Sequence, residues 1–167
     1  MLKVLPRLAV LGAISLCLAA LAQAPLHAQP TTSGGSGEAL LNLHNTVAVH
    51  GYDPVAYFTE NRAVRGSKAI LERLGGATYY FRSRANRYTF LKDAPGYQPQ
   101  LGGFCATSMA MGRLEDINPD IFLLYRGKLY LFKDEAAMAL FLNNPERTIA
   151  EASQNFFKMA SRKREYY

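Results

Sequence analysis

Cys105 has the most reactive side chain in the sequence, and it lies in the segment Gly102-Gly-Phe-Cys-Ala106. Met109 and Met111 follow it, and Cys105 and Met109 share one face of a helix because they are four residues apart. Thiolate and thioether sulfurs are soft donors that suit monovalent copper. This spacing favours a site for copper or another soft metal, and the alternative is that the three sulfurs pack as core residues.

Two further candidate ligands, His50 and Asp53, lie about fifty residues earlier in the chain. A histidine near the thiol is a third ligand or a base that activates it, and the alternative is an ordinary surface residue. Asp53 followed by Pro54 is typical first of a helix N-cap, and a cation-binding role is the alternative. His44 carries less weight because it leads into the domain. The predicted metal ligands are therefore Cys105, His50, Met109, Asp53 and Met111.

Residues 1–28 have the layout of a secretory signal peptide, with a basic start, an apolar run and small residues before the cleavage point at Ala28. The apolar run from Leu8 to Ala22 has fifteen residues, whereas a permanent membrane span needs about 20. We therefore expect a periplasmic or secreted protein with no integral membrane span after cleavage.

Export changes the composition that matters for function. The whole chain has 167 residues, two cysteines and a net charge of +6, and cleavage removes Lys3, Arg7 and Cys17. The remaining 139 residues carry 17 basic and 13 acidic side chains, a net +4, with Cys105 as their one thiol. An internal disulfide is then excluded, and so diffuse a positive charge does not favour binding to nucleic acid.

Composition divides the exported chain into three parts. Residues 29–37 are rich in Gly, Ser and Thr and are typical of a flexible linker, and residues 161–167 form a short basic tail. Residues 38–160 have the aromatic and aliphatic content of a single domain.

The domain contains an internal sequence repeat, in which two segments are related by an offset of 51 residues. The segment from Gly76 to Leu91 matches the segment from Gly127 to Leu142 with six identities in sixteen positions. In each copy a glycine turn precedes a strand with Tyr and Phe on one face, and Ser83 or Asp134 then caps a helix.

This pattern predicts an α+β fold in which two related hairpin-plus-helix units build a small antiparallel sheet. The strands that enter the two turns are expected over residues 70–74 and 121–125. A C-terminal helix from about Glu146 to Ala160 is expected to cover one side.

The ordered motifs of the mature chain resemble those of exported bacterial YHS-domain proteins. They are Gly51-Tyr-Asp-Pro-Val-Ala-Tyr-Phe58, Val64-Arg-Gly-Ser67, Gly102-Gly-Phe-Cys-Ala106 and Gly127-Lys-Leu-Tyr130, and the resemblance spans roughly Val47 to Phe156. It implies a small metal-associated module. The cysteine ligands of metal-binding YHS modules match Ala56, Arg82 and Asn86 here, so that particular site is not carried over. The resemblance is to a cysteine-poor subgroup that keeps the segment around Cys105.

Three functions remain open from the sequence. The favoured one is a non-enzymatic module that binds a metal, copper or another soft ion, or a small ligand. The second is a thiol-based redox protein, since a cysteine near a helix N-terminus has a stabilised thiolate. The third is an accessory protein that docks on an envelope complex through tyrosine-rich surface.

Overall fold

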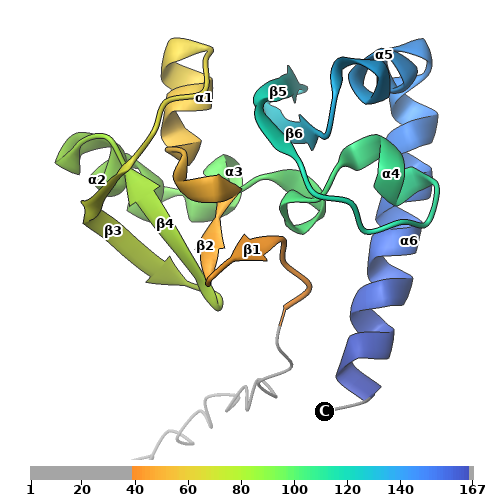
Figure 1. Cartoon of the computed structure of the whole chain (residues 1–167), viewed down its shortest axis with the longest axis horizontal. Helices are drawn as coiled ribbons and strands as arrows, with labels where there is room; N and C mark the ends of the chain where they lie inside the picture. Colours follow the sequence, from red (N-terminus) through yellow and green to blue (C-terminus); the bar gives the residue numbers. More distant parts are fainter. Residues whose placement is uncertain (1–38, 166–167) are drawn as a thin grey trace, which may run out of the picture. The chain divides into compact units, whose positions relative to one another are not determined.

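The computed structural model of this chain describes residues 39–165. The predicted signal peptide and linker, residues 1–28 and 29–37, lie outside the described residues. The described chain has the predicted α+β architecture, with two hairpin-plus-helix units and a long C-terminal helix (Figure 1).

The strands form two small sheets. A mixed sheet has the order β1-β2-β4-β3, in which β2 pairs in parallel with β4 through Val47 and Thr78, and β5 pairs with β6 in a separate antiparallel sheet. The expected antiparallel pairing is thus present within each hairpin, and the parallel strand comes from the segment that precedes the repeat. The bounds are β1 Leu43–His44, β2 Val47–Ala48, β3 Ser67–Leu74, β4 Ala77–Phe81, β5 Asn118–Tyr125 and β6 Lys128–Phe132.

The helices of the described residues alternate with these hairpins. The short 3-10 turns η1 and η2 each precede a short α-helix, and α2 and α5 each follow a hairpin. The bounds are η1 Val49–Gly51, α1 Pro54–Glu60, α2 Arg84–Lys92, α3 Ala94–Tyr97, η2 Gln100–Gly103, α4 Ala106–Ala110, α5 Glu135–Asn143 and α6 Pro145–Glu165.

The sequence repeat corresponds to a structural repeat. The strands β3 and β5, the strands β4 and β6, and the helices α2 and α5 have bounds that differ by 51 residues in each case. Both caps act as predicted, because the Ser83 hydroxyl accepts from the amide of Asn86 at 3.0 Å and the Asp134 carboxylate accepts from that of Ala137 at 2.7 Å.

The structural repeat extends further towards the N-terminus than the sequence repeat indicates, because η1 and η2 are also equivalent, at an offset of 52 residues. Val49 and Leu101 have φ of 50° and 56°, and Gly51 and Gly103 have φ of 81° and 82°. Each of these turns leads into a short helix, α1 or α4. The first half therefore has one residue more than the second between its 3-10 turn and its hairpin. For this reason a search at the single offset of 51 does not detect the equivalence of η1 and η2.

Each half has its own aromatic packing. The Phe90 ring of α2 lies 4.8 Å from Tyr79 and 5.2 Å from Phe81, and Phe141 of α5 makes the equivalent contacts with Tyr130 and Phe132 at 5.3 and 5.2 Å. The buried rings belong to one hydrophobic core in which both halves take part. Burying each such ring contributes roughly 2–3 kcal/mol.

The C-terminal helix packs along α4 (Figure 1). The Asn155 amide of α6 donates to the carbonyl oxygens of Met109 and Ala110, at 3.0 and 2.9 Å. The Met109 carbonyl also accepts from the amide of Gly112 at 2.9 Å, so the Asn155 side chain adds to the capping of the C-terminal end of α4. None of the helices in the described residues combines the length and apolar character that a bilayer span requires.

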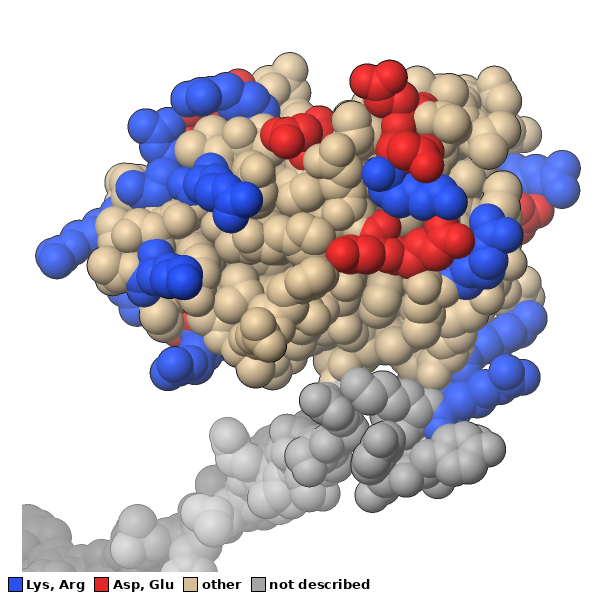
Figure 2. All heavy atoms as spheres, in the orientation of Figure 1, with Lys and Arg blue, Asp and Glu red and all other residues tan. Residues whose placement is uncertain are grey.

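Charged side chains are unevenly distributed between the halves. On the face shown in Figure 2, Lys and Arg dominate over β3 and α2, whereas Asp and Glu gather mainly over the second half. There Glu115 contacts both Lys133 and Arg113, at 2.7 and 3.2 Å. Because such pairs are exposed, they contribute little to stability.

Candidate metal centre

Cys105 is the N-cap residue of α4 and is fully buried. Its amide donates to the carbonyl of Glu115 at 3.0 Å, its side chain caps no backbone amide, and it forms an isolated parallel bridge with Leu131 of β6. The thiol therefore packs in the core as a small apolar group, which is one of the alternatives that the sequence left open.

The two candidate methionines lie in different environments. Met109 is fully buried, whereas Met111 is 54% exposed and its sulfur accepts from the Arg113 guanidinium at 3.2 Å. Cys105 and Met109 are thus both enclosed in the core, while Met111 faces solvent. The soft-metal site of Cys105, Met109 and Met111 stays a prediction.

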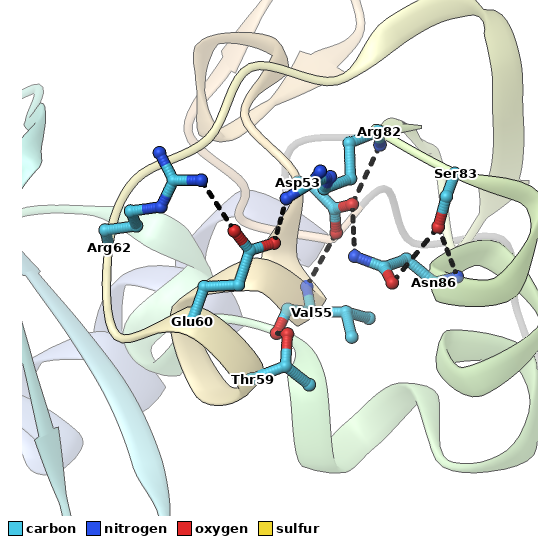
Figure 3. Close-up of polar contacts among 8 residues, drawn as sticks. All are labelled: Asp53, Val55, Thr59, Glu60, Arg62, Arg82, Ser83 and Asn86. Carbon is cyan, nitrogen blue, oxygen red and sulfur yellow. Dashed lines mark hydrogen bonds and ion pairs between the residues drawn. The ribbon is translucent and has the colours of Figure 1, made fainter.

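Asp53 is a buried N-cap that joins α1 to the end of the first hairpin (Figure 3). Its carboxylate accepts from the amides of Val55 at 2.9 Å and Arg82 at 2.8 Å, and from the Asn86 side chain at 2.8 Å. Three donors therefore already surround this carboxylate. The structural role predicted for Asp53 is confirmed.

Ala56, Arg82 and Asn86, three positions without a thiol, all contact Asp53. Arg82 and Asn86 donate to its carboxylate, and the amide of Ala56 donates to its main-chain oxygen at 3.2 Å. This corner of the first half is thus a hydrogen-bonded network without a thiol. Beside it, the Arg82 guanidinium pairs with Glu60, and this hydrogen bond lowers the pKa of the Glu60 carboxyl (Figure 3).

A different group of metal-binding side chains converges on Asp116. His44 Nε2 lies 2.9 Å from one carboxylate oxygen of Asp116, and His50 Nε2 lies 2.8 Å from the other. The donor atoms of the three residues all lie within 4.8 Å of one another, and the two imidazole centroids are 4.1 Å apart. We call His44, His50 and Asp116 the His-His-Asp cluster.

Local backbone geometry positions the two histidines. β1 and β2 are joined by a two-residue turn in which Asn45 and Thr46 have φ of 50° and 70°, as a tight hairpin requires. His50 follows in η1 with φ of 51°, a conformation that is uncommon outside glycine. The hairpin and this turn bring together imidazoles that are six residues apart.

Asp116 comes from the second half, between α4 and β5, and Asn42 holds it in place. The Asn42 side chain donates to Asp116 Oδ1 at 2.8 Å and to the carbonyl of Gly103 at 3.1 Å. The amide of Ile117 donates to the same carboxylate oxygen at 2.8 Å. These contacts orient the carboxylate towards the histidines.

The electrostatics of the cluster favour an ionised carboxylate. Partial burial opposes ionisation of Asp116, but hydrogen bonds from Asn42, the Ile117 amide and the two histidines outweigh it, so the pKa of Asp116 lies well below its usual value. The side chains of His44, His50 and Asp116 are 55%, 24% and 48% exposed, so a metal ion has access from solvent.

The donor set suits a borderline divalent ion. Two imidazole nitrogens and one carboxylate oxygen are ligands of Zn²⁺ and Cu²⁺ in proteins. With bonds of about 2.1 Å at a tetrahedral angle, neighbouring donors stand about 3.4 Å apart. The observed separations of 2.8 and 2.9 Å are hydrogen bonds to the two different oxygens of Asp116, and they need to widen by about half an ångström to admit an ion.

Sequence reasoning selected one member of the cluster, His50, gave His44 less weight and missed Asp116. Asp116 is 66 residues from His50, and no local pattern links them. A signal exists in the repeat, because Asp116 stands 51 residues after Arg65, which instead lies over the Tyr52 ring at 4.8 Å. Positions where the two halves differ in charge can therefore indicate residues that have a role beyond the shared fold.

Comparisons with known proteins identify no family or function for this chain. No family model, no curated protein and no solved structure matches the chain.

Proposed function

We propose that this protein is an exported, non-enzymatic metal-binding module that holds a divalent copper or zinc ion at the His-His-Asp cluster. The supporting observation is that the Nε2 atoms of His44 and His50 lie 2.9 and 2.8 Å from the two carboxylate oxygens of Asp116. The donor atoms of the three residues lie within 4.8 Å of one another, close enough to share one ion.

Exposure of the cluster favours binding over catalysis. A catalytic metal needs a shaped, water-excluding cavity in which the substrate is held. His44 and Asp116 are instead about half exposed at the surface. Open coordination positions there suit capture and release of an ion.

Export and family are parts of the same proposal that rest on the sequence. The signal-like residues 1–28 support a periplasmic or secreted location, and the ordered motifs around Asp53 and Cys105 support a relationship to exported YHS-domain proteins. Docking on an envelope complex stays a prediction. The thiol-based alternative requires solvent access that the buried Cys105 lacks.

Direct metal titration tests the proposal. Tag-free protein comprising residues 29–167 is titrated with Cu²⁺ and Zn²⁺ by calorimetry, beside the variants His50→Ala and Asp116→Asn. We expect one equivalent to bind. Loss of an outer-shell partner alone costs about 10- to 100-fold in affinity, and loss of a ligand in either variant should cost at least that much. Cys105→Ser and Asp120→Asn, an exposed aspartate outside the cluster, are controls expected to bind as the original protein does.

Two outcomes contradict the assignment. If His50→Ala and Asp116→Asn both bind metal as the original protein does, the ion does not bind at the His-His-Asp cluster. If Cys105→Ser loses binding, the metal site lies around the thiol instead. Circular dichroism on every variant separates loss of ligands from loss of fold.

A further inference from the structure

A groove of about 470 Å³ lies beside the N-terminal segment, apart from the metal centre. Its walls come from the chain before β1, from β2, from the Pro99–Gly102 region and from α6. The aliphatic or aromatic side chains that carry the argument are Leu40, Leu43, Ala48, Phe156 and Ala160. Its volume falls in the range of about 300–1,000 Å³ that small-molecule sites occupy.

One polar pair interrupts these apolar walls. The Gln98 amide donates to the Tyr79 hydroxyl at 3.0 Å, and both residues line the groove. The hydroxyl is the acceptor in this bond, and within the described residues no bond is found in which it is the donor. Its proton is therefore available to an acceptor atom in the groove.

The second half shows that this pair is not required by the fold. Tyr130 is the repeat equivalent of Tyr79 and packs in the same way, against Phe141 instead of Phe90. The residue 51 positions after Gln98 is Ile149, which carries no hydrogen-bonding side chain. The hydroxyl-amide pair is thus specific to the half that has the groove.

We propose that the groove binds a single-chain amphiphile, a medium-chain fatty acid, with its alkyl chain along Leu40, Leu43 and Phe156 and a carboxylate oxygen accepting from the Tyr79 hydroxyl. The flexible chain matches aliphatic walls, and the groove is too small for both chains of a diacyl lipid. This site shares no residue with the His-His-Asp cluster, so the fatty-acid proposal and the metal proposal can be tested independently.

Binding of dodecanoate, below its micelle concentration, tests this site. It is followed by calorimetry with protein comprising residues 29–167. We expect one molecule per chain. Tyr79→Phe removes the donor to the carboxylate and keeps the ring, so affinity should fall about 10-fold or more. Tyr130→Phe is the matched control and should bind as the original protein does.

A second pair of variants tests the location by volume. Ala160→Trp places a large ring in the groove from a helix surface and should abolish binding, whereas Ala139→Trp, on an exposed position of α5, should leave it unchanged. Binding that survives both Ala160→Trp and Tyr79→Phe, or no dodecanoate binding at all, overturns the proposal. Co-sedimentation with dilauroyl phosphatidylcholine vesicles in the absence of dodecanoate binding also overturns it, because the ligand is then a membrane.

Discussion

Asp53 and Cys105 occupy equivalent places in the two halves of the molecule. Each is the N-cap of a short helix that follows a 3-10 turn, and each donates its amide to a main-chain oxygen, that of Val64 at 2.8 Å or of Glu115 at 3.0 Å. Both are fully buried. One position therefore holds a hydrogen-bonded carboxylate and the other a thiol that packs as an apolar group.

Asp53→Ala should destabilise the fold strongly. The change removes the acceptor for the amides of Val55 and Arg82 and for the Asn86 side chain. The buried Val55 amide costs about 1–3 kcal/mol when it is left without a partner, and the two part-buried donors add to this loss. We expect the free energy of unfolding in urea to fall by about 3 kcal/mol or more. Asp53→Asn keeps one acceptor oxygen and should lose less. A loss below about 1 kcal/mol in Asp53→Ala would contradict the network.

Cys105 should react with thiol reagents only after the chain unfolds. The side chain has no exposed surface, so a disulfide reagent reaches it only through opening of the structure. We expect labelling of native protein to be slow and to accelerate sharply near the urea midpoint. Rapid labelling in native buffer would instead support the redox function.

Zinc should raise the melting temperature of the protein through the His-His-Asp cluster. A ligand at 100 times its dissociation constant adds about 2.7 kcal/mol to the free energy of unfolding. For a chain of this size that corresponds to a rise of roughly 5–10 °C in Tm. His44→Ala should lose the rise and leave the metal-free Tm almost unchanged, because His44 is more than half exposed. An equal rise in both proteins places the zinc elsewhere.

Stability should decline in alkali because of Tyr57. Burial, with smaller contributions from Asp120 and Tyr52, raises the pKa of Tyr57 well above its ordinary value, and its hydroxyl donates to the Pro119 carbonyl at 2.9 Å. The folded state holds this proton more tightly than the unfolded state, so the stabilisation is complete below about pH 10 and is lost as the pH rises further.

The variant Tyr57→Phe checks that assignment. It should cost about 1 kcal/mol at neutral pH, from the lost hydrogen bond, and should flatten the decline of Tm above pH 10. Tyr88→Phe, at an exposed position, is the control and should keep the decline. If Tm declines equally above pH 10 in Tyr57→Phe and Tyr88→Phe, ionisation of Tyr57 does not cause the decline.

Gly66→Ala should be more harmful than Gly76→Ala. A Cβ at Gly66 clashes with the carbonyl carbon and oxygen of Tyr80, whereas at Gly76 it meets nothing within 4 Å and only the φ of 84° is unfavourable. We expect losses of about 2–3 kcal/mol at Gly66 and about 1 kcal/mol at Gly76. Chemical denaturation of the two variants measures both, and the reverse order would contradict the close approach.

The fold follows largely from local patterns in the sequence. The glycine turns, the alternating aromatics and the caps Ser83 and Asp134 each act within a few residues, so a single chain suffices to predict both hairpins and both helices. The sequence predicted one antiparallel sheet, whereas the two hairpins lie in separate sheets and β2 adds a parallel pairing with β4, a contact between distant segments. The His-His-Asp cluster was missed because Asp116 meets His50 only in the folded chain.

The two halves share a backbone plan but differ at residues of the His-His-Asp cluster. Gly102 stands where the first half has His50, and Arg65 stands where the second half has Asp116. The first half supplies the two histidines of the His-His-Asp cluster and the second half supplies Asp116. The cluster therefore depends on the difference between the halves, and restoring either half to the likeness of the other would erase it while leaving the backbone plan intact.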